Sequence, residues 1–186
     1  CAEFVQSFGN VDEVFANAPH IFKNTFFQHR GAAHPLETRA MMASYDELLD
    51  HLTFYAASQS PHRVREIYAK LRGVDDNQVR VVVPDIGGGF GAKGQTYPEY
   101  FSVAAAARML RRPVKYMEDR RENFTATHHE RDQLWTAEIA FNEDGKLLGF
   151  RGTLLHDSGA YVPWGIITPY IAASTVPGPY LLPAYE

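Results

Sequence analysis

The stretch VRVVVPDIGGGFGAKG, from Val79 to Gly94, decides how the rest of this sequence is interpreted. Its first half is an almost continuous run of apolar residues, which is typical of a strand buried on both faces of a sheet. Its second half places five glycines among the eight residues from Gly87 to Gly94. Glycine permits positive φ angles and lets a ligand approach main-chain N–H groups. The stretch therefore predicts a buried strand followed by a binding loop for an anionic or oxo-bearing ligand.

Helices are predicted on both sides of this strand and loop. The alanine-rich segment from Pro98 to Arg111 follows the loop and is expected to be helical, with Pro113 just beyond its end. A further buried strand is expected at Val114–Met117. Before the loop, Ser60 is a candidate N-cap for a helix from Pro61 to about Leu71 whose apolar residues recur at helical spacing, with Gly73 at its C-terminal position.

The remaining segments are rich in strands. Strands are predicted at His20–Gln28, Arg39–Ser44, Leu52–Ala57, Gln133–Phe141 and Lys146–His156, and a short helix capped by Asn10 is predicted at Val11–Ala18. The sequence Asn142-Glu143-Asp144-Gly145 is a hairpin turn signal between the last two strands. We therefore expect an α+β fold, a mixed β-sheet with helices packed on it.

Composition excludes several classes of partner. The 186 residues are 45% hydrophobic with a net charge of −4, which indicates a globular chain without a basic patch. We therefore expect no nucleic acid partner, and no run approaches the roughly 20 apolar residues that span a bilayer. The single cysteine, Cys1, cannot form an internal disulfide or hold a zinc or iron–sulfur site by itself.

The glycine loop has a rival interpretation as a dinucleotide site. Gly89, Gly91 and Gly94 satisfy G-x-G-x-x-G between a strand and a helix, and Glu118 or Asp119 follows the next strand. Against this, the ring of Phe90 occupies a turn that must be tight, and four residues delay the helix. A Rossmann-like dehydrogenase domain stays an alternative, as does a tight connection that binds nothing. The phosphate-loop pattern fails, because Lys93 is followed by glycine rather than Ser or Thr.

The whole string from Val79 to Gly94 closely resembles the molybdenum-cofactor loop of the xanthine dehydrogenase, aldehyde oxidase and aerobic carbon monoxide dehydrogenase superfamily of molybdenum hydroxylases. Further segments resemble family motifs in the same order: Pro35–Arg39, Ser58–His62, Glu118–Phe124 and Asp157–Tyr161. The resemblance implies that residues 1–186 are an internal fragment of the molybdopterin-binding domain of a large subunit. It also implies that the fragment is inactive alone.

The resemblance implies a set of cofactor-binding residues: Gln59, Gly88, Gly89, Phe90 and Gly91. The Gln59 amide would hydrogen-bond a molybdenum oxygen ligand, and main-chain N–H groups around Phe90 and Gly91 would hold the apical oxo group. Both would contact ligands of the metal, not the metal, whose direct ligands come from the cofactor. Phe90 and Gly94 would face the substrate. No catalytic residue is implied within this chain, because the family's glutamate base lies further towards the C-terminus.

The implied reaction is hydroxylation or oxidation of a small molecule, an aldehyde, an N-heterocycle or carbon monoxide, with water as the oxygen source. The implied cofactor is molybdenum–molybdopterin, plain or as the cytosine dinucleotide, with iron–sulfur clusters and FAD on other subunits or domains. Purine hydroxylases carry a glutamate where Gly94 stands, so a purine substrate is not favoured. We expect a cytoplasmic parent protein. A scaffold that has lost cofactor binding is the non-enzyme alternative.

Five ionisable residues outside this set also have a structural interpretation. Glu37 and Arg39, two apart on an expected strand, would share a face and could form an ion pair or line the cofactor cavity. Lys93 would contact the cofactor phosphate or neutralise Asp85 or Glu99. His128 and His129 are adjacent and would point to opposite faces, which favours a hydrogen-bonded turn over a metal site.

Overall fold

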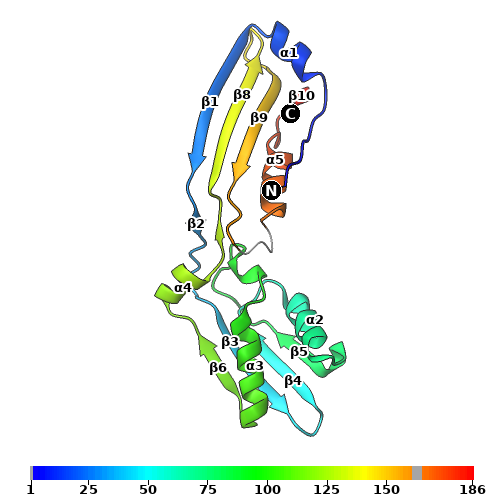
Figure 1. Ribbon diagram of the computed structural model, residues 1–186, viewed down its shortest axis with the longest axis vertical. Coiled ribbons are helices and arrows are strands. Elements are labelled where there is room, and N and C mark those ends of the chain that lie inside the picture. Colours follow the sequence, from blue (N-terminus) through cyan, green and yellow to red (C-terminus); the bar gives the residue numbers. More distant parts are fainter. Residues whose placement is uncertain (1, 161–164) are drawn as a thin grey trace. The chain divides into compact units, whose positions relative to one another are not determined.

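The computed structural model describes residues 2–160 and 165–186 (Figure 1). The chain divides into two compact units, one formed by Cys1–Gly31 with Arg131–Glu186 and the other by Ala32–Glu130. We call them unit 1 and unit 2. No described helix combines the length and the apolar character that crossing a membrane requires.

Unit 2 contains the glycine loop and is built on a four-stranded mixed sheet (Figure 1). Its strands and α-helices in chain order are β3 (Ala40–Asp46), β4 (His51–Ala56), α2 (Pro61–Arg72), β5 (Val79–Val82), α3 (Pro98–Leu110), β6 (Val114–Met117) and α4 (Arg120–Ala126). Two 3₁₀ turns, η1 (Asp76–Gln78) and η2 (Ala92–Gly94), precede β5 and α3. The strand order is β5-β4-β3-β6, in which β3 is antiparallel to both neighbours and β4 is parallel to β5.

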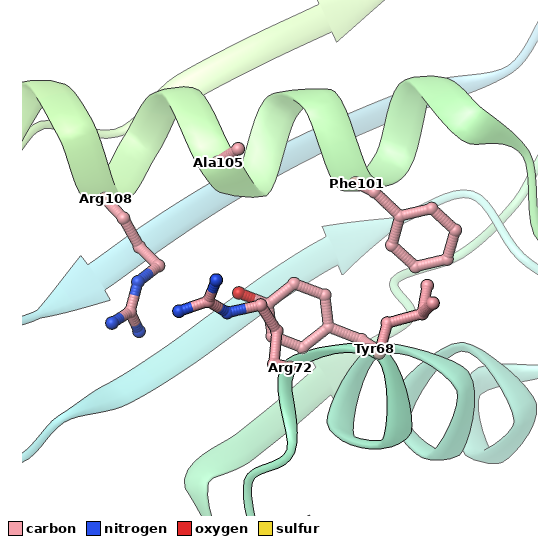
Figure 2. Close-up of a pocket in the computed structure, with 6 residues that line it drawn as sticks. Tyr68, Arg72, Phe101, Ala105 and Arg108 are labelled. Carbon is pink, nitrogen blue, oxygen red and sulfur yellow. The ribbon is translucent and has the colours of Figure 1, made fainter.

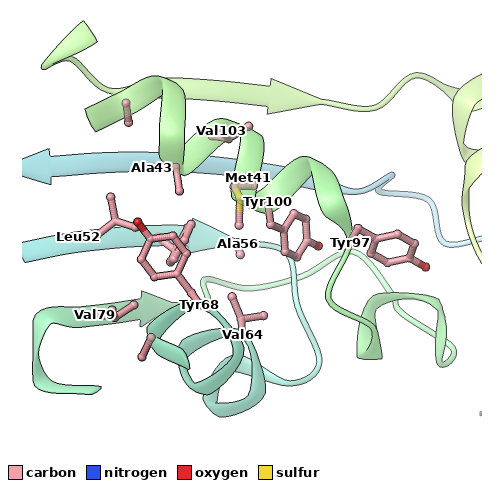
Figure 3. Packing of buried hydrophobic residues seen from close by; sticks show 14 residues of the cluster. Met41, Ala43, Leu52, Ala56, Val64, Tyr68, Val79, Tyr97, Tyr100 and Val103 are labelled. Carbon is pink, nitrogen blue, oxygen red and sulfur yellow. The ribbon is translucent and has the colours of Figure 1, made fainter. Parts of the chain in front are cut away.

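The core of unit 2 lies between this sheet and the two longer helices (Figure 3). Alternate residues of the central strands are buried, since successive side chains of a strand point to opposite faces. The sheet contributes Met41, Ala43, Leu52, Phe54 and Ala56, and the helices contribute Val64, Tyr68, Tyr100, Val103, Ala104 and Ala107. Burying each large apolar side chain stabilises the fold by about 1.5–3 kcal/mol.

The ends of the two longer helices follow the signals in the sequence. Helix α2 begins at Pro61, and Gly73 ends it in a left-handed conformation with φ of 65°, as predicted. Ser60 is the N-cap residue, as predicted, and its carbonyl accepts a hydrogen bond from the Val64 N–H at 3.1 Å, but its side chain makes no capping hydrogen bond. Helix α3 begins at Pro98 and ends at Leu110, with Arg111 as its C-cap in a left-handed conformation.

Strands β5 and β6 are edge strands, which corrects the prediction that both are buried on two faces. In β5, Val79 is buried but Arg80 is exposed, and in β6 Lys115 and Met117 are exposed. The apolar run after Val79 was therefore misleading, because an edge strand with one covered face can still be rich in valine. Two strands separate β5 from β6, so the strand-loop-helix-strand segment is not the adjacent parallel pair of a dinucleotide fold.

Unit 1 is a second mixed sheet with short helices. Its elements are α1 (Val11–Asn17), β1 (His20–Gln28), β8 (Gln133–Phe141), β9 (Leu147–His156), α5 (Ile167–Thr175) and β10 (Ala184–Tyr185), and the strand order is β1-β8-β9-β10. The predicted hairpin is present, since β8 and β9 are antiparallel neighbours. Asn10 caps α1 as predicted, because its side chain accepts a hydrogen bond from the Glu13 N–H group. The short strands β2 (Gly31–Ala32) and β7 (His129–Glu130) pair with each other.

The prediction of an α+β fold with mixed sheets and packed helices is confirmed. Two helices were not predicted. Helix α4 has a capping box formed by Asp119 and Glu122, and the D-x-x-E spacing that signals it is visible in the sequence. Helix α5 lies in a segment where proline and glycine recur. The family-like segment Asp157–Tyr161 is described only up to Ala160, so Tyr161 lies outside the described residues.

Candidate functional site

The topology of the unit 2 sheet brings four distant segments to one of its ends. The first residue of β3 pairs with the last residue of β6, and the second pairs with the last residue of β4. Strand β5 runs parallel to β4 and ends beside it. The segments before β3 and after β4, β5 and β6 therefore meet at this end, which is where parallel strands commonly place ligand sites. These segments carry Glu37, Arg39, Gln59, the glycine loop and Glu118.

The glycine loop, Gly87 to Gly94, needs glycine for two different reasons. Gly88 and Gly91 have φ angles of 93° and 89°, which L side chains rarely adopt. Gly87 and Gly89 have room for no side chain, because an added Cβ would lie 2.6 Å from Glu37 Cβ and 2.4 Å from Gln59 Oε1 respectively. Phe90 adopts a positive φ of 52° although it is not glycine.

Gln59 holds the loop through its side-chain oxygen. Its Oε1 accepts hydrogen bonds from the Gly91 N–H (3.0 Å) and the Lys93 N–H (3.2 Å), and its own N–H donates to the Lys93 carbonyl at 2.9 Å. The Gln59 Nε2 group has no hydrogen-bond partner among the described residues, and the side chain is exposed. The amide can therefore donate outward while its oxygen fixes the loop.

A row of unpaired N–H groups lies beside Gln59. Within the described part of the chain, the N–H groups of Gly88, Gly89 and Phe90 make no hydrogen bond, whereas those of the flanking residues Gly87 and Gly91 are both paired. Consecutive unpaired N–H groups in a loop of alternating handedness are suited to an anionic or oxo-bearing ligand. The loop thus offers a donor set without any side-chain charge.

Glu37 connects the beginning and the end of the loop. Its Oε2 accepts hydrogen bonds from the Gly87 N–H (2.9 Å) and from Lys93 Nζ (2.6 Å), and its N–H donates to the Gly87 carbonyl at 3.2 Å. Burial raises the pKa of Glu37, but the hydrogen bonds from Lys93 and Gly87 outweigh that effect and leave the pKa below its ordinary value. Arg120 of α4 fixes the preceding segment by donating to the carbonyls of Pro35 and Leu36.

A buried ion pair lies at the same end of the sheet. The Arg39 guanidinium donates to Glu118 Oε1 through Nε (2.8 Å) and Nη2, and both side chains are fully buried. Asn123 Nδ2 donates to the other carboxylate oxygen at 2.9 Å, and the guanidinium lies 3.7 Å from the centre of the Tyr97 ring. Burial raises the pKa of Glu118, but hydrogen bonds from Arg39 and Asn123 and the Arg39 charge leave it below its ordinary value.

Two predictions named the wrong ion-pair partners for charged residues. Glu37 and Arg39 do not pair with each other, because residues 36 and 37 form a bend before β3 rather than part of the strand. Lys93 is paired with Glu37 instead of Asp85 or Glu99, and its side chain is fully buried. His129, by contrast, is hydrogen-bonded through Nε2 to the Phe124 carbonyl at 2.9 Å, in line with its predicted structural role.

Sequence comparison identifies the group to which these features belong. Residues 2–186 match the family described as the molybdopterin cofactor-binding domain. This chain belongs to that family. The prediction from the resemblance is thereby confirmed, and the match runs through both units.

Three relatives illustrate the relationship. The chain is 39% identical to the nicotine 6-hydroxylase large subunit of Paenarthrobacter nicotinovorans, over 97% of this chain and 22% of that protein. It is 44% identical to the carbon monoxide dehydrogenase large chain of Hydrogenophaga pseudoflava, over 81% of this chain and 19% of that protein. The crystal structure of quinoline 2-oxidoreductase from Pseudomonas putida 86 superposes with a TM-score of 0.85 at 32% identity, over 97% of this chain and 24% of that chain. The chain thus spans about a fifth of the length of the curated relatives it matches.

The donor set at the glycine loop fits a molybdopterin cofactor. A metal whose ligands come from the cofactor requires hydrogen-bond donors from the protein, and Gln59 Nε2 and the N–H groups from Gly88 to Phe90 are such donors. Across residues 2–160 and 165–186, no group of three His, Cys, Asp or Glu side chains could hold a metal ion. The Gly91 N–H, predicted to hold an oxygen of the cofactor, donates to Gln59 here, so that role requires this hydrogen bond to be shared or opened.

The two residues predicted to face the substrate differ in their surroundings. The Phe90 side chain is 72% exposed and lies over Gly88, where an added Cβ would be 3.0 Å from its ring. At Gly94 an added Cβ would meet no atom within 4 Å, and φ is not positive, so a larger residue would fit there without strain. These substrate roles stay predictions.

A cavity of about 210 Å³ lies away from the glycine loop, between α2 and α3 (Figure 2). It is lined by Tyr68, Leu71, Arg72, Phe101, Ala105 and Arg108. The Arg108 guanidinium is already engaged by Asp50 at 3.2 Å and lies over the Tyr45 ring. None of the lining residues contributes to the donor set described above.

Proposed function

We propose that this chain forms one wall of the cofactor site in a molybdenum-dependent oxidoreductase. The parent protein hydroxylates or oxidises an aldehyde, an N-heterocycle or carbon monoxide and takes the oxygen from water. The observation that carries the proposal is the row of unpaired N–H groups from Gly88 to Phe90 beside the outward Gln59 amide. Membership of the molybdopterin cofactor-binding family supports it.

Each residue of the wall has a distinct role in the proposal. Gln59 Nε2 and the N–H groups of Gly88, Gly89 and Phe90 bind and orient oxygen atoms of the cofactor by hydrogen bonds. The bound cofactor, in the plain or cytosine dinucleotide form, supplies the two-electron redox chemistry. The Phe90 ring shields the loop from water on the side of Gly88. In this proposal the general base comes from residues outside the chain.

The open space at Gly94 bears on the class of substrate. Purine hydroxylases carry a glutamate at this position of the loop, whereas this chain has Gly94, where an added Cβ would meet no described atom within 4 Å. Relatives at 32–44% identity are named for nicotine, quinoline and carbon monoxide. We therefore favour a small N-heterocycle, an aldehyde or carbon monoxide over a purine.

Partner proteins are part of the proposal. The relatives named above include a large subunit and a large chain, which indicates assembly with smaller subunits. Iron–sulfur and flavin subunits or domains would accept the electrons, in a cytoplasmic complex. Residues 1–186 would then be a fragment of the molybdopterin-binding domain and inactive by themselves.

The test is molybdenum content, measured by mass spectrometry on the complete protein that contains this chain, purified with its co-purifying subunits. Gln59→Glu keeps an acceptor oxygen for the Gly91 and Lys93 N–H groups but replaces the amide donor, whereas Gln59→Ala removes both functions. Gln28→Ala, at an exposed residue of β1, is the matched control.

The proposal requires about one molybdenum per wild-type chain by cofactor stoichiometry. Gln59→Glu must lower molybdenum content or turnover at least about tenfold, because it removes one hydrogen-bond donor to the cofactor. Gln28→Ala must leave both quantities unchanged. Wild-type protein without molybdenum would overturn the proposal and leave a scaffold that has lost cofactor binding. Full loading and turnover in Gln59→Glu would remove Gln59 from the donor set.

A further inference from the structure

A single carboxylate closes the stem of the glycine loop. Glu37 Oε2 accepts one hydrogen bond from the N–H of Gly87, the first residue of the loop, and another from Nζ of Lys93, the penultimate residue. Gly87 also returns a hydrogen bond by accepting from the Glu37 N–H. Because the two ends of the loop are fixed on the same oxygen, the conformation of the five residues between them depends on Glu37.

The main chain of Lys93 is fixed independently. Its N–H donates to Gln59 Oε1, and its carbonyl accepts from the Gln59 N–H at 2.9 Å and from Ser58 Oγ at 3.4 Å. The Lys93 side chain therefore extends from a rigid point into the interior and reaches one carboxylate, that of Glu37. The ion pair thus joins the segment after β4 to the segment before β3 across the base of the loop.

The burial of the two partners is unequal. The Lys93 side chain is fully buried, and the Glu37 side chain is 37% exposed. Removing the carboxylate charge would leave a buried ammonium group without a counter-charge, which a protein interior tolerates poorly. We expect the Lys93 side chain to move out of the interior into water. The loop would then open, because the contact between Lys93 and Glu37 that joins its two ends is lost. Removing both charges together leaves no such penalty.

We propose that the Glu37–Lys93 ion pair is the positioning device of the glycine loop. It holds the N–H groups of Gly88, Gly89 and Phe90 in their ligand-binding orientation before any cofactor arrives. Neither residue touches the ligand in this proposal, and both act through the loop. The role of the ion pair in cofactor binding rests on the proposed function. Its effect on the conformation of the loop does not.

The experiment uses the complete protein with its co-purifying subunits and four variants. Glu37→Gln keeps the acceptor for the Gly87 N–H and removes the charge, and Lys93→Met keeps the length of the side chain and removes the ammonium group. The third variant combines both substitutions. Glu47→Gln is the control, because it neutralises one partner of an exposed ion pair with Arg111 in the same unit.

Two measurements are made on each protein. Amide hydrogen exchange of peptides covering residues 87–94 reports the loop directly, because the N–H groups of Gly87, Gly91 and Lys93 are hydrogen-bonded in the closed form. Molybdenum content reports the consequence for cofactor binding. Peptides from β8 and β9 in unit 1 serve as the internal reference for global unfolding.

Each single variant is expected to exchange roughly tenfold faster in the loop, with unchanged exchange in β8 and β9, as local opening predicts. The double variant is expected to exchange within about threefold of the single variants, because either substitution alone already removes the ion pair. A general loss of packing would instead be additive in the double variant, and that result overturns the proposal. Wild-type exchange in both single variants overturns it as well.

The failure of the proposed function is read separately. If the wild-type protein contains no molybdenum, the proposed function fails, and the exchange measurements still decide whether Glu37 and Lys93 position the loop. If the wild-type protein is loaded, both single variants and the double variant should contain less molybdenum. If the single variants exchange faster in the loop but contain as much molybdenum as wild type, the cofactor does not need a positioned loop. That result would overturn the role of the ion pair in cofactor binding.

Discussion

Arg39 and Glu118 form a fully buried ion pair at the sheet end that carries the glycine loop. The pair is supported by the main chain as well, because the Arg39 N–H donates to Glu118 Oε2 (3.1 Å) and the Glu118 N–H donates to the Arg39 carbonyl (3.0 Å). Asn123 of α4 satisfies a remaining lone pair of the carboxylate. Breaking such a pair leaves an uncompensated charge in the interior, whereas the intact pair is nearly neutral in its net effect.

The first prediction concerns the stability of this pair. Glu118→Gln should lower the free energy of unfolding by roughly 3–5 kcal/mol at neutral pH, because the buried Arg39 charge keeps only the more distant Glu99 carboxylate, at 3.5 Å. Thermal unfolding of the complete protein measures the change. The exposed pair of Glu47 and Arg111 offers the control, since Glu47→Gln should change stability by less than about 1 kcal/mol. Equal effects of the two substitutions would show that burial of the Arg39 pair does not matter.

The second prediction concerns how the difference in stability between wild type and Glu118→Gln depends on pH. The pKa of Glu118 in the folded protein lies below its ordinary value of 4.5, so the folded state binds this proton less readily than the unfolded state. The stabilisation from Glu118 is therefore complete above pH 4.5 and is lost as the pH falls through the lowered pKa. The gap in unfolding temperature between wild type and Glu118→Gln should be constant from neutral pH to about 5 and shrink below 4.5. A gap that widens in acid would contradict this sign.

Much of the fold followed from local signals in the sequence. Asn10, the Asn142 turn and Gly73 each act through contacts with residues close in sequence, which is why caps and turns were predictable. The edge positions of β5 and β6 were not, because a valine-rich run gives no information about which strands flank it. Burial on one face or two is decided by pairing with segments far along the chain.

In the candidate site, too, local motifs were predictable from the sequence and long-range partners were not. The glycine loop and Gln59 were found as motifs, but the partners of Glu37, Arg39 and Lys93 depend on which strand ends meet. Glu118 belongs to the segment Glu118–Phe124 that resembles a family motif, but the motif alone does not predict that this carboxylate faces Arg39. Pairing followed from the antiparallel contact of β3 with β6.

The third prediction uses the close approach of Gly89 to Gln59. Gly89→Ala would place a Cβ 2.4 Å from Gln59 Oε1, so the glutamine must move and the hydrogen bonds to Gly91 and Lys93 must break. Molybdenum content should fall at least about tenfold, as expected when a ligand-binding loop is displaced. Gly31→Ala is the control, because an added Cβ there meets no atom within 4 Å. Normal loading of Gly89→Ala would show that Gln59 tolerates displacement.

The fourth prediction concerns the backbone of Phe90. Its φ of 52° costs an ordinary residue about 1–2 kcal/mol, and glycine avoids this cost. Phe90→Gly should therefore be as stable as Phe90→Ala or more stable by up to about 1 kcal/mol, even though glycine is usually the less stable of the two. Thermal unfolding of the two variants gives the comparison, in which the loss of the exposed ring is common to both. A clearly less stable glycine variant would mean that the loop does not hold φ positive.

The fifth prediction separates backbone strain from close contact in unit 1. Gly9 and Gly145 have nearly the same φ, 73° and 77°, but differ in their surroundings. An added Cβ at Gly9 would lie 2.3 Å from the Pro183 carbonyl oxygen, whereas at Gly145 it would meet no atom within 4 Å. Gly145→Ala should cost about 1–2 kcal/mol from the left-handed backbone alone. Gly9→Ala must in addition displace the backbone beside Pro183, and with it the bridge between Phe8 and Tyr185, so its unfolding temperature should be clearly lower. Equal losses in the two variants would show that the segment before β10 yields without cost, and that only the backbone angle requires glycine at position 9.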